Sequence, residues 1–447
     1  MATPLHDVLP VERGGVFARE RAGDPAVAVS FDPLLRQGLV LTLSMAAMNG
    51  ANWLYHAVMS RALGPAGYGG LSALLGLLFI MTVPATTIQM GLSALVARRE
   101  VGGDGSFFAT ISTRWLGGFL MLGLVLSFVP LLLSPWLATL LRLASPVPVM
   151  IAGTVLISWL PLPVVRGLLQ GAQRFWTLGA SFIIEGLLKL GIAVLLVSIG
   201  LGLSGAVAAI SLGALGALAL TMLGMGRRSA WRSAGVGPQD AVVFRSLLPY
   251  AVAVAAFTLL TQSDVVLVKM LFPPTDAGVY AAASTGGKII LYLTAPLAMV
   301  MLPEAVRRQA HSGGGRPVLI RSAKYAAAAG SGMVAAYILV PRPIMHVLFG
   351  SAYVEGAPLL WLVGLGMLAA ELALLGVYYL LGMGRSAVLR WVIVQALVFP
   401  VVLWLFANSL ETVAVLVALA GLVTFAGVWW PLLRRSDSPL RHQRQAS

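Results

Sequence analysis

The sequence predicts an all-α polytopic membrane protein, with 12 transmembrane helices arranged as two parallel-repeat six-helix lobes around a central cavity. Apolar stretches of about 18 or more residues, long enough to cross a bilayer, recur almost from end to end. Charged residues make up only 10% of the chain, whereas soluble domains carry about 25%. A unit of two apolar runs joined by a short turn occurs twice, at residues 49–99 and 258–308, and this recurrence predicts the duplication.

The two copies of this unit match at a fixed spacing. A shift of 209 residues superposes a proline, a glycine and an arginine pair of the first copy on those of the second: Pro65 on Pro274, Gly69 on Gly278, and Arg98-Arg99 on Arg307-Arg308. Because each predicted lobe holds an even number of helices, both lobes begin on the same side of the membrane, as in transporters built from parallel repeats.

The spans are bounded by polar or turn-forming residues. In chain order they are 37–60, 71–95, 108–133, 146–168, 176–199, 205–225, 246–271, 279–303, 320–340, 357–381, 387–407 and 411–433. The fourth span is broken by Pro161 and Pro163, and the ninth runs into Pro-Arg-Pro at 341–343. Proline removes a backbone donor and kinks a helix, so these spans are expected to bend.

The basic residues predict the orientation. If the chain starts inside, 21 Arg and Lys residues flank the spans on that side, and only Arg61, Arg142, Lys269 and Arg342 fall on the other. Such a bias sets orientation, so both termini are expected in the cytoplasm of a cell whose inner (plasma) membrane holds the protein. The predicted division is a flexible tail (1–35), a first lobe (36–226), a cytoplasmic linker (227–245), a second lobe (246–433) and a basic tail (434–447).

Composition excludes several classes of function. The chain has no cysteine, which excludes disulfides, thiolate nucleophiles and cysteine-bound metals. The first 35 residues lack an apolar core and a cleavage site, so they are not a signal peptide. The net charge of +14 comes from residues between apolar runs, so topology explains it better than nucleic-acid binding.

Three segments carry a resemblance to a known family. They are ANWLYHAVMSRALGPAGYGGLSALLGLL, RGLLQGAQRFWTLGASFIIEGLLKL and QSDVVLVKMLFPPTDAGVYAAASTGGKIILYL. In this order they resemble the oligosaccharide flippases, the Wzx-like polysaccharide biosynthesis proteins, of the multidrug/oligosaccharidyl-lipid/polysaccharide exporter superfamily. The resemblance covers the chain from about residue 36 onward.

The resemblance implies alternating access and movement of a polyprenyl-diphosphate-linked oligosaccharide from the inner to the outer leaflet. Implied partners are that lipid-linked oligosaccharide, membrane lipids, a polysaccharide polymerase and glycosyltransferases. No cofactor is expected, and coupling to H⁺, Na⁺ or the membrane potential is left open. Cation-coupled multidrug exporters and peptidoglycan-lipid flippases share this fold and remain alternatives. An enzyme is not expected, because the outer connections are short and hold no cluster of catalytic residues.

Lys288 and Asp264 are the first site candidates. A charge in hydrocarbon costs roughly 2.5–3.5 kcal/mol on insertion scales, so it normally faces protein or water. The resemblance implies a basic residue at Lys288 that holds the diphosphate, whose oxygens accept charge-assisted hydrogen bonds. The alternative is an ion pair with Asp264 or Glu304 that only fixes helix packing. Asp264 is a candidate to carry a proton or a sodium ion, or to pair with Lys269 or Lys288.

Three further charged residues lie inside spans. Glu185 and Lys189 are four residues apart in the fifth span, so they share a helix face and are expected to pair, either as a structural bridge or as a moving switch. Glu371 in the tenth span has no oppositely charged neighbour in the sequence. It is a candidate proton site, unless an arginine meets it in the fold. Gly286-Gly287-Lys288 is not a phosphate loop, because Ile289 follows where serine or threonine is needed.

A polar stripe follows the first span. Asn49, Asn52 and His56 recur at helical spacing, and Arg61 closes the span at its outer end. The stripe is expected to line the cavity and face the second lobe. For Arg61 the alternative is that its head group reaches the membrane interface while its stem stays apolar.

Overall fold

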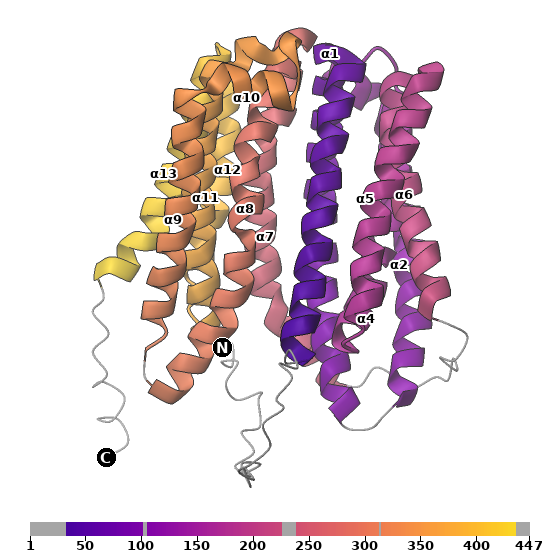
Figure 1. The fold of residues 1–447 in the computed structure, drawn as a ribbon, viewed down its shortest axis with the longest axis vertical. Coiled ribbons are helices and arrows are strands. Elements are labelled where there is room, and N and C mark those ends of the chain that lie inside the picture. Colours follow the sequence, from indigo (N-terminus) through magenta and orange to yellow (C-terminus); the bar gives the residue numbers. More distant parts are fainter. Residues whose placement is uncertain (1–32, 102–104, 226–237, 313, 435–447) are drawn as a thin grey trace, which may run out of the picture.

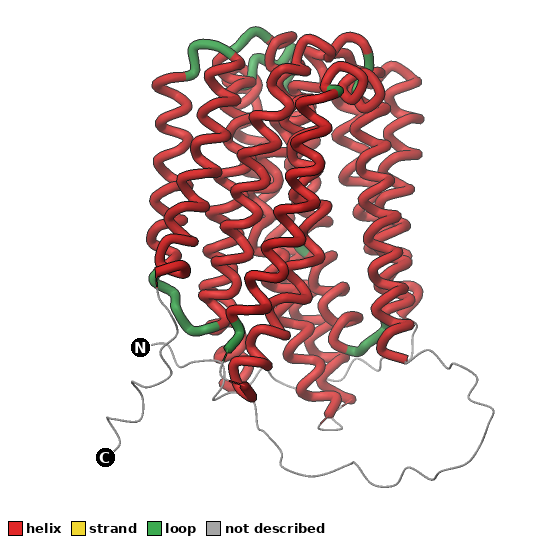
Figure 2. The backbone as a smooth tube through the Cα atoms, turned by 60° about the vertical axis from the view of Figure 1, so that its left-hand side comes forward, coloured by secondary structure: helices red, strands yellow, loops and turns green. Residues whose placement is uncertain are grey.

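A computed structural model describes four ranges of the chain: residues 33–101, 105–225, 238–312 and 314–434. Within these ranges the chain forms helices joined by short connections, and no strand occurs. The helices run roughly along one axis, with most connections at its two ends (Figures 1 and 2). Most residues of the predicted tails and of the predicted linker fall outside the described ranges.

The elements follow one another closely. They are α1 (Pro33–Val101), α2 (Gly105–Leu140), α3 (Val147–Trp159), α4 (Pro161–Gly171), α5 (Phe175–Leu196), the π-helix η2 (Val197–Leu201), α6 (Gly202–Met225), α7 (Pro238–Leu271), α8 (Pro274–Ser312), α9 (Arg316–Leu339), α10 (Pro341–Leu348), the 3₁₀-helix η3 (Ser351–Gly356), α11 (Ala357–Gly382), α12 (Val388–Phe406) and α13 (Leu410–Arg434).

Element α1 is two antiparallel arms rather than one rod. In a straight helix, residues 12 apart lie about 18 Å apart along the axis. His56 Nδ1 and Tyr68 OH are nevertheless 3.0 Å apart, so the chain reverses between them. The reversal lies at Gly64, whose φ of 64° is open to glycine at little cost, and Pro65 then starts the second arm with a helical φ. The two arms correspond to the first two predicted spans.

The count of spans is only partly tested. Eight helical segments of the described chain are long and apolar enough to cross a membrane, or nine if α9 and α10 form one bent span. The segment Val40–Met81 contains the α1 reversal, and Phe175–Leu223 contains α5 and α6, which pack against each other. The class of all-α, multi-pass membrane protein is therefore confirmed, and the number 12 stays a prediction.

Two predicted breaks occur where proline predicts them. Helices α3 and α4 are separate because the chain is interrupted at Leu160, immediately before Pro161. Helices α9 and α10 meet at Pro341 at an angle of 99°, so α10 lies across the end of the helix assembly. We call this end the α10 end.

The helices fall into two groups, the first half (residues 33–225) and the second half (238–434), which lie side by side in Figure 1. Near the α10 end one apolar cluster joins them, with Tyr55 and Tyr68 from the first half packed among Phe349 and Tyr353 from the second. At the opposite end three separate clusters each stay within one half, except that Leu247 of α7 reaches a first-half cluster. The halves are therefore sealed by apolar packing at the α10 end.

The turns of the two halves meet back to back. A Cβ on Gly69 would lie 2.9 Å from the backbone nitrogen of Gly278, and a Cβ on Gly278 would overlap the carbonyl of Pro65. Gly69 and Gly278 are the pair that the 209-residue shift superposes. A residue that touches its own repeat equivalent lies close to a two-fold axis, which is the relation expected of parallel repeats.

Large apolar side chains cover the outside of the assembly. On α2 and α12, for example, the side chains of Leu132 and Leu405 are 76% and 67% exposed. Contiguous exposed apolar surface of this extent is not stable in water and is what a bilayer solvates.

Candidate functional site

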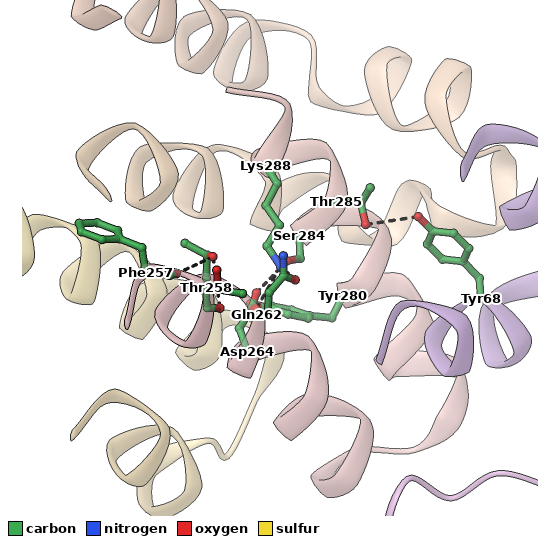
Figure 3. Close-up of polar contacts among 10 residues, drawn as sticks. Tyr68, Phe257, Thr258, Gln262, Asp264, Tyr280, Ser284, Thr285 and Lys288 are labelled. Atoms are coloured by element: carbon green, nitrogen blue, oxygen red, sulfur yellow. Dashed lines mark hydrogen bonds and ion pairs between the residues drawn. The ribbon is translucent and has the colours of Figure 1, made fainter. Parts of the chain in front are cut away.

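A buried ion pair lies between α7 and α8 (Figure 3). Lys288 Nζ is 3.2 Å from Asp264 Oδ1, and Gln262 Oε1 accepts a second hydrogen bond from Lys288 at 3.2 Å. The other oxygen of Asp264 accepts hydrogen bonds from Tyr280 OH at 2.9 Å and Ser284 Oγ at 2.7 Å. Asp264 is 0% exposed.

The helix geometry explains why these groups converge. Asp264 and Lys288 lie on opposite sides of the α7–α8 turn, and Lys288, which lies farther from the turn, reaches back to Asp264 through its long side chain. Tyr280, Ser284 and Lys288 are spaced by four residues and therefore share one face of α8. A buried charge is tolerated when it is paired and its hydrogen bonds are made, and both conditions hold for Asp264.

This network borders the first half of the chain. Gly76 of α1 packs against the backbone and side chain of Gln262. One turn before Lys288, Thr285 accepts a hydrogen bond from Tyr68 OH at 3.3 Å, which Figure 3 shows reaching across from the first half. The same hydroxyl of Tyr68 lies 3.0 Å from His56 Nδ1, so His56 is connected to this part of α8.

A second lysine approaches the same interface from the first half. Lys189 of α5 donates a short hydrogen bond to Asn52 Oδ1 and lies 4.7 Å from the centroid of the Tyr55 ring. Asn52 lies one helical turn before His56 on α1, so Lys189 approaches the same face of that helix. The structure therefore brings Lys189 and Lys288, one from each half, to the neighbourhood of a single histidine.

The expected pairing of Glu185 with Lys189 is wrong. Glu185 Oε2 instead accepts a hydrogen bond from Arg166 at 2.7 Å, and Arg166 also donates to the side chain and carbonyl oxygens of Ser181 and lies over the Phe182 ring at 4.1 Å. Within the described chain no ion pair joins Glu185 to Lys189. A lysine four residues along the same helix is less favourably placed than an arginine fork from α4, because the fork satisfies carboxylate and backbone together.

Arg166 belongs to this charged cluster although the sequence does not single it out, because it is one of the cations that predict the orientation. It is 7% exposed. The available signal was its place inside the predicted span 146–168, where an arginine needs a partner.

The remaining candidates are separate from this cluster. Asn49 lies one turn before Asn52 and is half-buried. Arg61 lies at the α10 end, bound to backbone carbonyls. Glu371 of α11 is 2% exposed, and its charge acts on Tyr378 of the same helix. The site assignment of these residues stays a prediction.

The described residues support neither a phosphate-binding loop nor a metal site. Gly286 and Gly287 lie inside α8, where a Cβ would meet Leu360 and Val363 of α11, so they allow helix packing rather than phosphate cradling. No group of three or more histidine, aspartate or glutamate side chains that could hold a metal ion occurs in the described part of the chain.

The charges of the cluster do not cancel. Arg166 pairs with Glu185 and Lys288 pairs with Asp264, while Lys189 donates to the neutral Asn52 and lies over the Tyr55 ring. Three cations and two carboxylates leave the cluster with one net positive charge, which favours an anionic guest.

A family model matches most of the chain. The family described as "Polysaccharide biosynthesis protein" matches residues 58–358, a range that includes Arg166, Lys189, Asp264 and Lys288. No curated protein matches the sequence.

Solved membrane transporters have similar folds. An inward-facing multidrug resistance MATE family transporter of the MOP superfamily aligns with a TM-score of 0.69 and 13% identity, covering 89% of this chain and 98% of that one. The eukaryotic MATE transporter AtDTX14 aligns with a TM-score of 0.62 and 14% identity, covering 91% and 97%. A MOP superfamily transporter from Pyrococcus furiosus, whose binding pocket is described as having reverse polarity, aligns with a TM-score of 0.58 and 15% identity, covering 89% and 95%. At these identities the likeness shows a shared fold.

Proposed function

Because the chain belongs to the polysaccharide biosynthesis protein family, we propose that it transports a polyprenyl-diphosphate-linked oligosaccharide from the inner to the outer leaflet. The protein has the fold of transporters of the MOP superfamily, not that of an enzyme. Transport by alternating access, for export of a cell-surface polysaccharide, is the function that the site supports best.

The observation that carries the proposal is the pair of lysines at the meeting of the halves. Lys189 and Lys288 come from different halves, and both lie near His56: Lys189 binds Asn52, one turn before His56, and Thr285, one turn before Lys288, binds Tyr68, which contacts His56. Phosphate oxygens bind ammonium groups through short charge-assisted hydrogen bonds. A diphosphate held between the two lysines would touch both halves at once, which is the position that a substrate needs if its release is to follow their relative movement.

A protein route is needed because of the chemistry of the substrate. A sugar-diphosphate head is charged and rich in hydroxyl groups, and burying each unpaired polar group in hydrocarbon costs several kcal/mol, roughly 4–8 for a hydroxyl on alkane scales. In our proposal the cations and hydroxyl groups between the halves replace water around the head, and the lipid tail stays in the bilayer.

The cellular setting follows from the charge distribution. We place the α10 end outside and both termini in the cytoplasm, in the inner (plasma) membrane, because the described cations at the α10 end are few. The two lobes (36–226 and 246–433), joined by the linker, would be the parts that move relative to each other.

Glycosyltransferases on the inner side and a polymerase on the outer side are the proposed partners. Asp264 and Glu371 are the candidates for coupling transport to H⁺, to Na⁺ or to the membrane potential.

A cation-coupled drug exporter is the competing proposal, and the fold supports it equally. Its substrates are cationic, so its cavity would favour carboxylates over ammonium groups. The net positive charge of the cluster favours the anionic lipid. A peptidoglycan-lipid flippase would use the same diphosphate chemistry and differs in the sugar.

The test is a flipping assay in proteoliposomes with a fluorescent polyprenyl-diphosphate sugar. We expect Lys288→Met and Lys189→Met each to lower the flipping rate by about tenfold or more, the loss of one charged hydrogen bond. Lys324→Met is the matched control, because Lys324 is an exposed lysine on α9 and its loss should leave the rate unchanged.

Unchanged flipping in both lysine variants would remove the site assignment. No flipping by the parent protein, together with transport of a lipophilic cation such as ethidium, would replace the proposed function with the drug exporter.

A further inference from the structure

The guanidinium group of Arg61 joins the two halves at the α10 end. It donates to the carbonyls of His346 at 3.2 Å, Val347 at 2.7 Å and Leu348 at 3.1 Å, all on α10, and to Ala57 of its own helix at 2.7 Å. The last carbonyls of a helix have no partner within the helix and carry partial negative charge. Arg61 therefore caps a helix that belongs to the other half.

Ser60, beside Arg61, adds two more bonds between the halves. Its hydroxyl donates to the Phe349 carbonyl at 3.1 Å, and its own carbonyl accepts from Tyr353 OH at 2.6 Å. The end of the first arm of α1 is therefore hydrogen-bonded to the segment of the second half that runs from residue 346 to residue 353.

Two more cations at this end make the same kind of contact. Arg142, just after α2, donates to the Phe272 carbonyl in the α7–α8 turn at 3.2 Å. Lys269 of α7 donates in the other direction, to the Ala66 carbonyl of α1 at 3.3 Å. The two contacts therefore cross the boundary between the halves in opposite directions.

A layer of aromatic rings lies beneath these cations. The ring of Tyr68 is 5.8 Å from that of Tyr353 and 6.0 Å from that of Phe349, and its hydroxyl binds Thr285. This layer lies between the cations and the turn of α8 that carries Lys288. At the α10 end, water from outside would have to pass both layers to reach the lysine.

We propose that Arg61, Arg142 and Lys269 form a carbonyl latch that holds the α10 end shut and must release before that end opens. All the cross-half hydrogen bonds described above lie at this end, whereas the apolar clusters of the opposite end stay within one half apart from Leu247. Opening at the α10 end therefore has to break the latch, and opening at the opposite end does not. The inference goes beyond the proposed function and holds for any substrate.

Because the chain has no cysteine, one introduced thiol can report on the latch. Ala277 is 2% exposed and lies where Gly69 meets the second half, so Ala277→Cys places a thiol beneath the latch. The protein is placed in lipid nanodiscs, where a water-soluble maleimide reaches both faces. We expect Arg61→Ala to speed labelling about tenfold, since charged hydrogen bonds are lost and each is worth about a factor of ten or more.

The matched control is Arg342→Ala. Arg342 is an exposed cation on α10 itself, so its removal changes the charge of the same helix without touching the latch contacts. Labelling at Ala277→Cys should stay at the parent rate. Equal acceleration in the Arg342 and Arg61 variants would mean that charge alone matters, and would overturn the latch.

A second reporter separates latch release from general loosening. Ala373→Cys on α11 is buried (0% exposed) in the apolar cluster of the second half at the opposite end. Arg61→Ala should leave its labelling slow. Acceleration at both reporters, or at neither, would overturn the proposal.

Discussion

The buried pair of Asp264 and Lys288 allows a quantitative test of what it contributes. In Asp264→Asn the amide retains the shape of the carboxylate, and its oxygen can still accept from Tyr280 and Ser284. Its NH₂ group then faces the ammonium group of Lys288, a donor against a donor. Removing one member of a buried pair leaves an uncompensated charge, so we expect this variant to lose about 3–5 kcal/mol of unfolding free energy.

The other variants complete a double-mutant cycle. Lys288→Met leaves a buried carboxylate that two hydroxyl groups still satisfy, with an expected loss of about 2 kcal/mol. The double variant Asp264→Asn/Lys288→Met removes both charges, and replacing a whole buried pair is often close to neutral. We expect it to lie within about 2 kcal/mol of the parent, with a coupling energy of about 3 kcal/mol or more.

Unfolding in denaturing detergent, followed by tryptophan fluorescence, measures these differences. The control cycle uses Glu304 and Arg308, an ion pair that is shorter, at 2.7 Å, but partly exposed, with side chains that are 29% and 47% accessible. Its coupling should be about 0.5 kcal/mol, because solvent screens exposed charges. Additive losses within about 0.5 kcal/mol at Asp264 and Lys288 would refute the reasoning. If the double variant folds well but still fails to flip lipid, Lys288 has a role beyond packing.

Two further substitutions, measured by the same unfolding assay, test one contact inside the first half and one contact between the halves. Arg166→Met leaves Glu185, whose side chain is 18% exposed, without its cation and should cost about 2–3 kcal/mol, and a loss below about 1 kcal/mol would show that water solvates Glu185. Gly278→Ala drives a methyl group into the Pro65 carbonyl and should cost about 1–3 kcal/mol of unfolding free energy. Gly332→Ala is the control, because no atom lies within 4 Å of its added methyl group, and it should be neutral or stabilising. Equal effects of the two substitutions would refute the close approach of Gly278 to Pro65.

The sequence predicts the fold class well because a bilayer constrains the chain strongly. The long apolar runs identify membrane-crossing helices, and the prolines at 161 and 341 predict the two observed breaks. The 209-residue shift picks out Gly69 and Gly278 as equivalent. Their contact could not be predicted in the same way, because nothing in a linear repeat says which of its residues lie near the axis. The resemblance is confirmed at the level of family, since the chain matches the polysaccharide biosynthesis protein family, and the fold is shared with a solved MATE transporter.

The sequence predicts the site less completely. The pairing of Asp264 with Lys288 was one of two alternatives, because Lys269 lies on the same helix and only the packed structure shows it turned toward α1. The choice of Lys189 for Glu185 relied on helical spacing, and the real partner, Arg166, reaches Glu185 from a different helix. Arg61 binds residues more than 280 positions away, a distance over which hydropathy and spacing carry no information.

The pairing of charges within each half has a consequence for biosynthesis. Arg166 of α4 pairs with Glu185 of the next helix, α5, and Asp264 of α7 pairs with Lys288 of the next helix, α8. Each of these carboxylates is therefore neutralised by a cation from its own half. A nascent first half can thus enter the bilayer with its acid already neutralised while the second is still on the ribosome. Two polypeptides divided at the 226–237 segment and produced together should accordingly assemble without either one having to insert an unpaired Glu185 or Asp264.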